Sequence, residues 1–363
     1  RAPMPLPIPK RTQRTTGLRP DIGMARIAVV FTGGTISMRH DPIAGGNVPA
    51  LGGEALLATV PGLGGVADLV PIDLGLTPAS HFAFSALFVV ASTVRQQLAR
   101  DDVDGAVVVQ GTDTIEETAF FLDLLHAGPK PIVVTGAMRS ASARDYDGPA
   151  NLTSAVRVAA APEIGSADVG VVVVLDGSIE PADDVTKTHA SAFDTFRSLN
   201  RGSLGRVVGA EVTLSGERGA RRWVTTDRAA ERVFLVTATV ATDGTPISAL
   251  HAAGADGFVV AATGAGNTSP TLLAAAEAAM ADGLPVVHAT RCPAGTASAG
   301  YAFPGGGATW IRAGAIPAGH LTGPKARIAL ALGIGAGLNR SGLARLLADP
   351  APIHDHDRFW EPI

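Results

Sequence analysis

Short apolar runs rich in β-branched residues alternate with longer Ala- and Leu-rich stretches through the first half of the chain. Each run ends at a Gly or Thr turn, as buried parallel strands do. The runs are Arg26 to Phe31, Val66 to Ile72, Gly105 to Gln110, Pro131 to Thr135 and Gly170 to Leu175. Helices are predicted between them at Gly53 to Val60, Phe84 to Arg100, Glu116 to His126 and Gly148 to Ala161. This alternation predicts an α/β fold with a mostly parallel sheet flanked by helices.

The pattern breaks between Gly202 and Arg232, where the sequence becomes polar and rich in Gly and Arg. Because the chain is longer than one hydrophobic core usually supports, we expect two domains. The predicted boundaries are a disordered extension or tag at 1–23, a larger catalytic domain at 24–205, a linker at 206–232 and a smaller C-terminal α/β domain at 233–363. In the smaller domain, strands are predicted at Val233 to Ala238, Gly257 to Ala261 and Pro285 to Ala289, with helices at Pro270 to Ala281, Pro324 to Gly333 and Arg340 to Leu347.

Composition narrows the classes of function. Of the 363 residues, 46% are hydrophobic and 17% are charged, which indicates a folded globular protein. The single cysteine, Cys292, excludes a disulfide framework and a Cys-based zinc site, and no residue spacing indicates another metal site. A net charge of −4 argues against a nucleic-acid partner, and no apolar stretch approaches the roughly 20 residues of a membrane span. We therefore expect a cytoplasmic protein that binds a small molecule.

Three loops after predicted strands carry unusual polar residues, and ligands of open parallel sheets bind at that edge. The first, FTGGTIS, places Thr32 and Gly33 at a strand end, where a plain turn is the alternative; the Lys of a phosphate loop is missing. The second, QGTDT, places Thr112 beside Asp113, although a helix N-cap explains part of it. In the third, DDVTKTHASAFDTF, Lys187 is either a solvated lysine or a proton acceptor. Together they supply a hydroxyl nucleophile and the groups that activate one.

Further motifs follow in order: VTGAMR with DGPANL, GAGN, and GPKAR. With TGGTI, GTDT and DVTKT, they form an ordered set from Ala25 to Gly333 that resembles the bacterial-type L-asparaginases. The resemblance implies hydrolysis of L-asparagine to L-aspartate and ammonia, without a cofactor, through an acyl-enzyme. Thr32 matches the nucleophile, and Thr112, Asp113 and Lys187 match the second catalytic set. Asp113 also matches the carboxylate that holds the substrate's α-ammonium group.

The resemblance also implies a substrate-binding set and an assembly. Backbone amides near Gly111 and Ala137 are expected to orient the substrate and its oxyanion. The pair that holds the α-carboxylate aligns with Ala79 and Ser80, and Ser269 matches a residue that a partner subunit contributes. The expected assembly is a homotetramer built from intimate dimers, or a homodimer, with L-asparagine as substrate and L-glutamine as a second candidate.

Two departures from the family pattern bear on function. The mobile loop after TGGTI usually carries a Tyr, and Asn47 stands at the aligned position; glycines at 45, 46, 52 and 53 predict a flexible lid here. A Glu that partner subunits contribute in many relatives has no counterpart between Pro293 and Gly307. These losses leave a second interpretation, an asparaginase-like ligand-binding or regulatory protein with weak or no turnover. The similar subunit of tRNA amidotransferases carries an extra N-terminal domain, which 23 residues are too few to form.

Overall fold

The computed structural model describes residues 23–348. Apart from Gly23, the predicted N-terminal extension lies outside these residues, as does the chain from Asp349 onward. Between residues 23 and 348, no helix has both the length and the apolar character needed to cross a membrane.

An eight-stranded sheet forms the centre of the larger domain, and its five strands at one side are parallel. The other three strands run antiparallel to their neighbours. In spatial order the strands are β4 (Asp68–Asp73), β1 (Arg26–Phe31), β5 (Gly105–Val109), β6 (Ile132–Thr135), β7 (Val171–Leu175), β8 (Ser178–Pro181), β11 (Gly205–Val208) and β12 (Glu211–Leu214). The expected mostly parallel sheet is confirmed.

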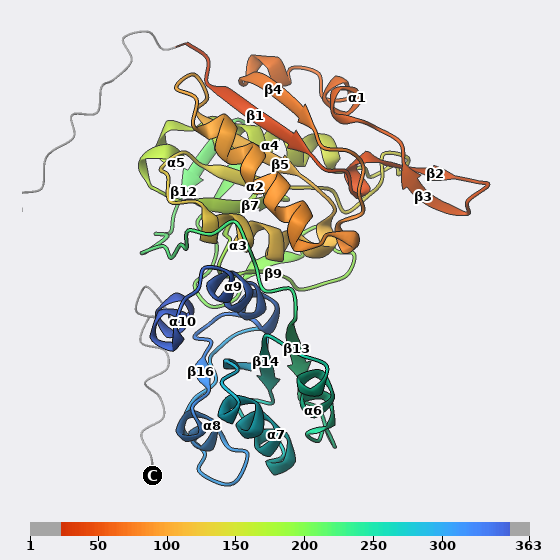
Figure 1. Ribbon diagram of the computed structural model, residues 1–363. Coiled ribbons are helices and arrows are strands. Elements are labelled where there is room, and N and C mark those ends of the chain that lie inside the picture. Colours follow the sequence, from red (N-terminus) through yellow and green to blue (C-terminus); the bar gives the residue numbers. More distant parts are fainter. Residues whose placement is uncertain (1–22, 349–363) are drawn as a thin grey trace, which may run out of the picture.

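Helices cover both faces of this sheet (Figure 1). Alternate side chains of β1 point to opposite faces. Val29 packs with α1 (Gly53–Ala58) and α4 (Gly148–Ala160), while Val30 packs with α2 (Phe84–Leu98). Because both faces are buried, the central strands are continuous apolar runs rather than alternating ones. The helices of this domain are α1 (Gly53–Ala58), α2 (Phe84–Leu98), α3 (Ile115–Leu125), α4 (Gly148–Ala160) and α5 (Pro162–Ser166).

The smaller domain repeats this layering around a four-stranded parallel sheet. Its strands are β13 (Val233–Thr237), β14 (Gly257–Ala262), β15 (Val286–Thr290) and β16 (Ile316–Pro317). Its helices are α6 (Thr245–Ala252), α7 (Pro270–Ala281), α8 (Gly307–Ala313), α9 (Gly323–Gly335) and α10 (Arg340–Leu347). One face of the sheet packs against α6 and α7, and the other against α9 and α10.

The irregular connection between the sheets is shorter than the linker predicted at 206–232. Residues up to Leu214 belong to β11 and β12, which extend the larger sheet. These strands alternate between more and less exposed positions, and Val208 is 71% exposed. A short edge ribbon of this kind lacks the apolar run by which buried strands are recognised in a sequence, so its residues resemble a linker.

The predicted flexible lid contains a β-hairpin. Strand β2 (Met38–Asp41) pairs antiparallel with β3 (Gly46–Pro49), and His40 lies opposite Asn47. The hairpin extends away from the larger sheet (Figure 1). The glycines that suggested flexibility therefore lie at or near its turn and at the start of α1.

An apolar cluster joins the two domains. Phe120, Phe121 and Leu124 of α3 belong to the same buried cluster as Ile328 and Leu330 of α9. Helix α9 thus packs on its own sheet and on the larger domain together.

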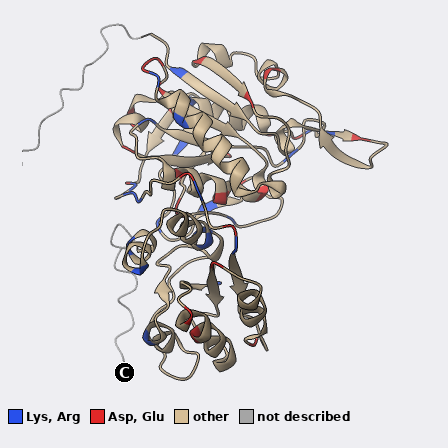
Figure 2. Cartoon of the chain, viewed as in Figure 1, with Lys and Arg blue, Asp and Glu red and all other residues tan. Residues whose placement is uncertain are grey.

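Charged residues of both signs also lie along this junction (Figure 2). Arg218, from the connection between the sheets, is buried between Asp123 of α3 and Asp183. Burial alone would raise the pKa of Asp183, but Arg218, His320 and Arg201 outweigh that effect and hold the pKa well below its ordinary value. Asp183 is therefore ionised, and its charge fixes the connection against the larger domain.

Candidate active site

Thr32 is the first residue after β1, at the carboxyl edge of the sheet. Its backbone N–H donates to the carbonyl of Val109, the last residue of neighbouring β5, at 3.0 Å. Its hydroxyl donates to the same carbonyl at 3.1 Å, and the residue is 3% exposed. The first bond holds the Thr32 backbone against β5 and the second orients its side chain, while the lone pairs of Oγ1 are not used in either bond.

Two glycines bring the loop after β1 against its neighbours: Gly34 against the loop after β5, and Gly33 against the segment after β4. Gly34 has a φ of 97°, and a Cβ there would lie 2.1 Å from the backbone nitrogen of Gly111. A Cβ on Gly33, with a φ of 102°, would lie 2.8 Å from the Cα of Leu76. Gly33 and Gly34 are therefore required both for the close approach of these backbone segments and for their own positive φ angles.

Replacing Gly34 by alanine is expected to destabilise the fold by about 2–5 kcal/mol, because the methyl group both clashes with Gly111 and strains the backbone. Chemical denaturation measures this change. Gly45→Ala is the matched control, since Gly45 has a φ of 69° but a methyl group added there would meet no atom within 4 Å. That variant should lose only the conformational part, about 1–2 kcal/mol. Equal losses in both variants would contradict the packing role of Gly34.

The second loop and Lys187 form one hydrogen-bonded cluster. Thr112 and Asp113 begin a 3₁₀ turn (Thr112–Thr114) directly before α3, and Lys187 ends strand β9 (Val185–Lys187). The Lys187 ammonium donates to Thr112 Oγ1 and to Asp113 Oδ1, each at 3.0 Å. The Lys187 side chain is 15% exposed and that of Asp113 is 74% exposed. The cluster therefore has a buried threonine, a mostly buried lysine and an open carboxylate.

Glu116 is a functional candidate that the sequence analysis did not single out. Its Oε2 accepts hydrogen bonds from Thr186 Oγ1 at 2.5 Å and from the Lys187 backbone N–H at 2.6 Å. Glu116 lies in the first turn of α3, after the GTDT sequence. Its position at an acidic helix start was visible in the sequence, but its contact with β9 depends on the tertiary fold.

Ala79 and Ser80 lie beside the second loop, in a 3₁₀ turn (Ala79–His81). The Ala79 carbonyl accepts a hydrogen bond from Thr114 Oγ1 at 3.3 Å, and a Cβ on Gly111 would lie 3.1 Å from the Ala79 Cβ. Ala79 is buried and Ser80 is exposed. The fold thus places an available hydroxyl next to the loop that carries Gly111.

Ala137 lies two residues beyond β6 and is fully buried. The preceding Gly136 packs on the second loop, because a Cβ there would lie 2.4 Å from the Gln110 carbonyl oxygen. Asn151 of α4 donates to the Gly136 carbonyl at 3.0 Å. The backbone near Ala137 is therefore held at the same edge of the sheet as Thr32 and Gly111.

Two predicted substrate residues, Asn47 and Ser269, belong to elements outside the loops that carry Thr32, Thr112 and Lys187. Asn47 is exposed on the projecting β2–β3 hairpin. Ser269, in the smaller domain, caps α7, where its hydroxyl accepts from the Leu272 N–H at 3.2 Å and donates to the Thr242 carbonyl at 2.6 Å. Ser269 therefore stabilises the first turn of α7 in the smaller domain.

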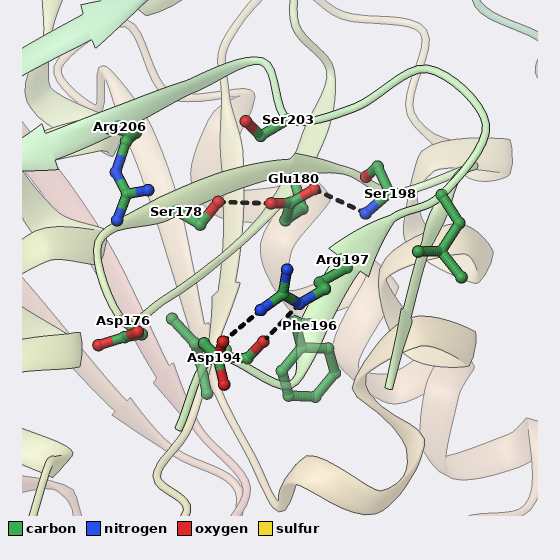
Figure 3. A pocket seen from close by; sticks show the side chains of 11 residues that line it. Asp176, Ser178, Glu180, Asp194, Phe196, Arg197, Ser198, Ser203 and Arg206 are labelled. Carbon is green, nitrogen blue, oxygen red and sulfur yellow. Dashed lines mark hydrogen bonds and ion pairs between the residues drawn. The ribbon is translucent and has the colours of Figure 1, made fainter. Parts of the chain in front are cut away.

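A polar cavity of about 430 Å³ borders the strand next to β9. That strand, β10 (Phe196–Ser198), pairs antiparallel with β9. In the cavity, Glu180 accepts hydrogen bonds from Ser178 Oγ and from the Ser198 backbone N–H (Figure 3). The residues that line it do not include the predicted catalytic set. Within residues 23–348, no group of three or more His, Cys, Asp or Glu side chains is arranged to hold a metal ion.

Comparison with known proteins matches the chain to two parts of one family. Residues 26–219 match the family described as "Asparaginase, N-terminal", and residues 232–347 match the "Glutaminase/Asparaginase C-terminal domain". The two matches cover nearly all the described residues.

Relatives and a solved structure agree with this assignment. A "Probable L-asparaginase" of Deinococcus radiodurans is 38% identical over 89% of this chain and 97% of that protein. "L-asparaginase 2" of Escherichia coli is 31% identical over 86% of this chain and 90% of that protein. The crystal structure of a "Probable Cytoplasmic L-asparaginase" of Campylobacter jejuni superposes with a TM-score of 0.79 at 28% identity, covering 89% of this chain and 99% of that one. The chain therefore belongs to the asparaginase family.

Proposed function

We propose that this protein hydrolyses the side-chain amide of L-asparagine to give L-aspartate and ammonia. The observation that carries the proposal is the Lys187 ammonium, which donates at once to the Thr112 hydroxyl and the Asp113 carboxylate. Thr32 lies at the end of the strand next to β5, and Gly34 packs on Gly111. These contacts support a site in which Thr32 is the nucleophile and the Lys187 cluster activates it, the combination that acyl transfer requires.

In the proposed reaction, Oγ1 of Thr32 attacks the amide carbon, and a carbon–oxygen bond forms as the hydroxyl proton passes through a water molecule to Thr112 and the amine form of Lys187, from which it later reaches the departing nitrogen. Backbone N–H groups near Gly111 and Ala137 stabilise the negative oxygen of the tetrahedral intermediate. The carbon–nitrogen bond then breaks, and the nitrogen takes up a proton and leaves as ammonia. Water attacks the resulting ester, which releases aspartate and restores the Thr32 hydroxyl.

Protons move through the second set of groups in this proposal. Thr112 and Lys187 share a hydrogen bond, so a proton can pass between them, and Asp113 stabilises the ammonium form of Lys187. The open carboxylate of Asp113 also suits an α-ammonium group of the substrate. In this proposal the Ser80 hydroxyl donates to the α-carboxylate of the substrate. No phenolic base is assigned, because the β2–β3 hairpin carries Asn47 and no Tyr.

We also propose that the active protein is a homotetramer or homodimer in the cytoplasm, with the smaller domain of one subunit, including Ser269, completing a site of its neighbour. The position of Ser269 outside the larger domain supports this arrangement. The name of the Campylobacter structure supports the location, whereas a Haemophilus influenzae relative is named periplasmic. Light scattering of the purified protein and cell fractionation test the two points.

Ammonia release from L-asparagine, L-glutamine and D-asparagine tests the proposed function. We expect turnover of L-asparagine at millimolar concentration, with slower release from the other two amides. Replacing the tested amide by L-aspartate gives the product-only control. Heat stabilisation by asparagine or aspartate without release of ammonia would contradict the proposal and favour a ligand-binding protein instead.

A further inference from the structure

Lys325 is a fully buried lysine on α9 whose ammonium group reaches across the domain junction. Its side chain is 0% exposed, and Nζ donates to the backbone carbonyl of Val185. Helix α9 belongs to the smaller domain, and Val185 begins β9 of the larger one. This bond therefore connects the smaller domain to the strand that ends in Lys187, two residues away.

Strand β9 also pairs antiparallel with β10, its Val185 side chain packs in an apolar cluster, and carboxylates of the larger domain contact both ends of the pair. Glu116 holds the Lys187 end of the strand through the Thr186 hydroxyl and the Lys187 N–H. At the other end, Val185 lies opposite Ser198 of β10, and Glu180 accepts from the Ser198 N–H at 3.0 Å (Figure 3). Within the larger domain the short strand is thus held by its pairing with β10, by apolar packing and by carboxylates, and Lys325 adds a contact from the smaller domain.

The packing of α9 alone does not explain why a lysine occupies position 325, because the site is fully buried. Burial lowers the pKa of Lys325 to about 8, although Glu116, Asp183 and Asp184 act in the opposite direction. This shift shows that burial of the cation is unfavourable. An apolar side chain of similar length would fill the space without that cost, and other α9 side chains in the cluster, such as Ile328 and Leu330, are apolar.

We propose that Lys325 is a positioning residue for the amidohydrolase reaction: through the Val185 carbonyl it sets the place of β9, and so the place of the Lys187 ammonium relative to Thr112 and Asp113. The role rests on the proposed function. It acts within one subunit and makes the packing of the smaller domain a determinant of the proton-transfer geometry in the larger one.

Lys325→Met tests the role, because methionine keeps most of the length of the side chain and removes the donor. We expect kcat for L-asparagine to fall by about 10- to 100-fold, as displacement of a catalytic group by about 1 Å does, with KM changed less than about threefold. Amide hydrogen exchange of a peptide containing Val185–Lys187 should become faster. If the Met variant does not fold, Lys325→Gln supplies a shorter, uncharged side chain with the same expected outcomes.

Leu330→Met is the matched control, since Leu330 is equally buried on α9 and apolar. It should leave both kcat and the exchange of the β9 peptide close to those of the wild type. Wild-type kcat in folded Lys325→Met, unchanged exchange at β9, or equal loss of kcat in Leu330→Met would each overturn the positioning role. A wild-type protein that releases no ammonia from any amide would instead overturn the proposed function, and the exchange experiment separates the two failures.

Discussion

The Thr32→Ala variant is expected to release ammonia from L-asparagine at least about 1,000-fold more slowly than the wild type, because removal of a nucleophile leaves only the binding and oxyanion contributions. Such a loss would not come from unfolding. Among residues 23–348, Thr32 Oγ1 makes one hydrogen bond, to the Val109 carbonyl, so its removal should reduce stability by only about 1 kcal/mol. Steady-state kinetics and thermal unfolding of the same preparation measure both quantities.

Thr135→Ala provides a closely matched control. Thr135 ends β6 as Thr32 follows β1, it is fully buried, and its hydroxyl donates to the Val174 carbonyl of the adjacent strand at 2.7 Å. Both variants therefore lose a hydroxyl-to-carbonyl bond at a strand end, and only Thr32→Ala should lose turnover. Retention of wild-type activity by Thr32→Ala, or an equal loss in Thr135→Ala, would remove Thr32 from the role of nucleophile.

Lys187→Met should reduce kcat by about 10²- to 10⁴-fold, which is the contribution expected of a positioned proton-transfer group. The variant also leaves the Asp113 carboxylate without its cation and the Thr112 hydroxyl without its donor. Because Asp113 is open to solvent, water replaces that contact, and the fold should persist. Ammonia release together with circular dichroism distinguishes catalytic loss from unfolding.

Lys130→Met separates this effect from the loss of any partly buried lysine. The Lys130 ammonium donates to the carbonyls of Leu98 at 2.9 Å and Arg100 at 2.7 Å, and it contacts none of the predicted catalytic residues in the described part of the chain. We expect lower stability with turnover near that of the wild type. Activity lost equally in both lysine variants would indicate a general structural effect and contradict the role of Lys187.

Most of the central elements could be predicted because burial on both faces leaves a simple signal. The strand predicted at Arg26 to Phe31 is β1 without a change of boundary, and Pro270 to Ala281 is α7. The elements that were not predicted, such as β11, β12 and the β2–β3 hairpin, are short and expose one side or both. Each pair is a local hairpin of four-residue strands, and strands this short and exposed lack the apolar run by which a buried strand is recognised.

In the candidate site, too, some residues could be predicted from the sequence and others could not. Thr32, Thr112 and Asp113 were predicted from their place after apolar strands, and Lys187 joins Thr112 and Asp113 in one cluster. Glu116 and Lys325 were not predicted as contributors, because each contacts β9 from a helix far away in the sequence. Local sequence identifies chemically unusual loops, whereas the groups that hold those loops become visible only when the chain is folded.

The apolar cluster that contains α3 and α9 has a consequence for how the molecule loses structure. Separation of the domains would expose Phe120, Phe121 and Leu124 to water, at a cost of roughly 2 kcal/mol for each large side chain. An early, independent melting of the smaller domain is thereby disfavoured, and heat should act on both sheets as a single cooperative unit. Resistance to thermal inactivation then depends on the apolar contact between α3 and α9 as much as on either sheet.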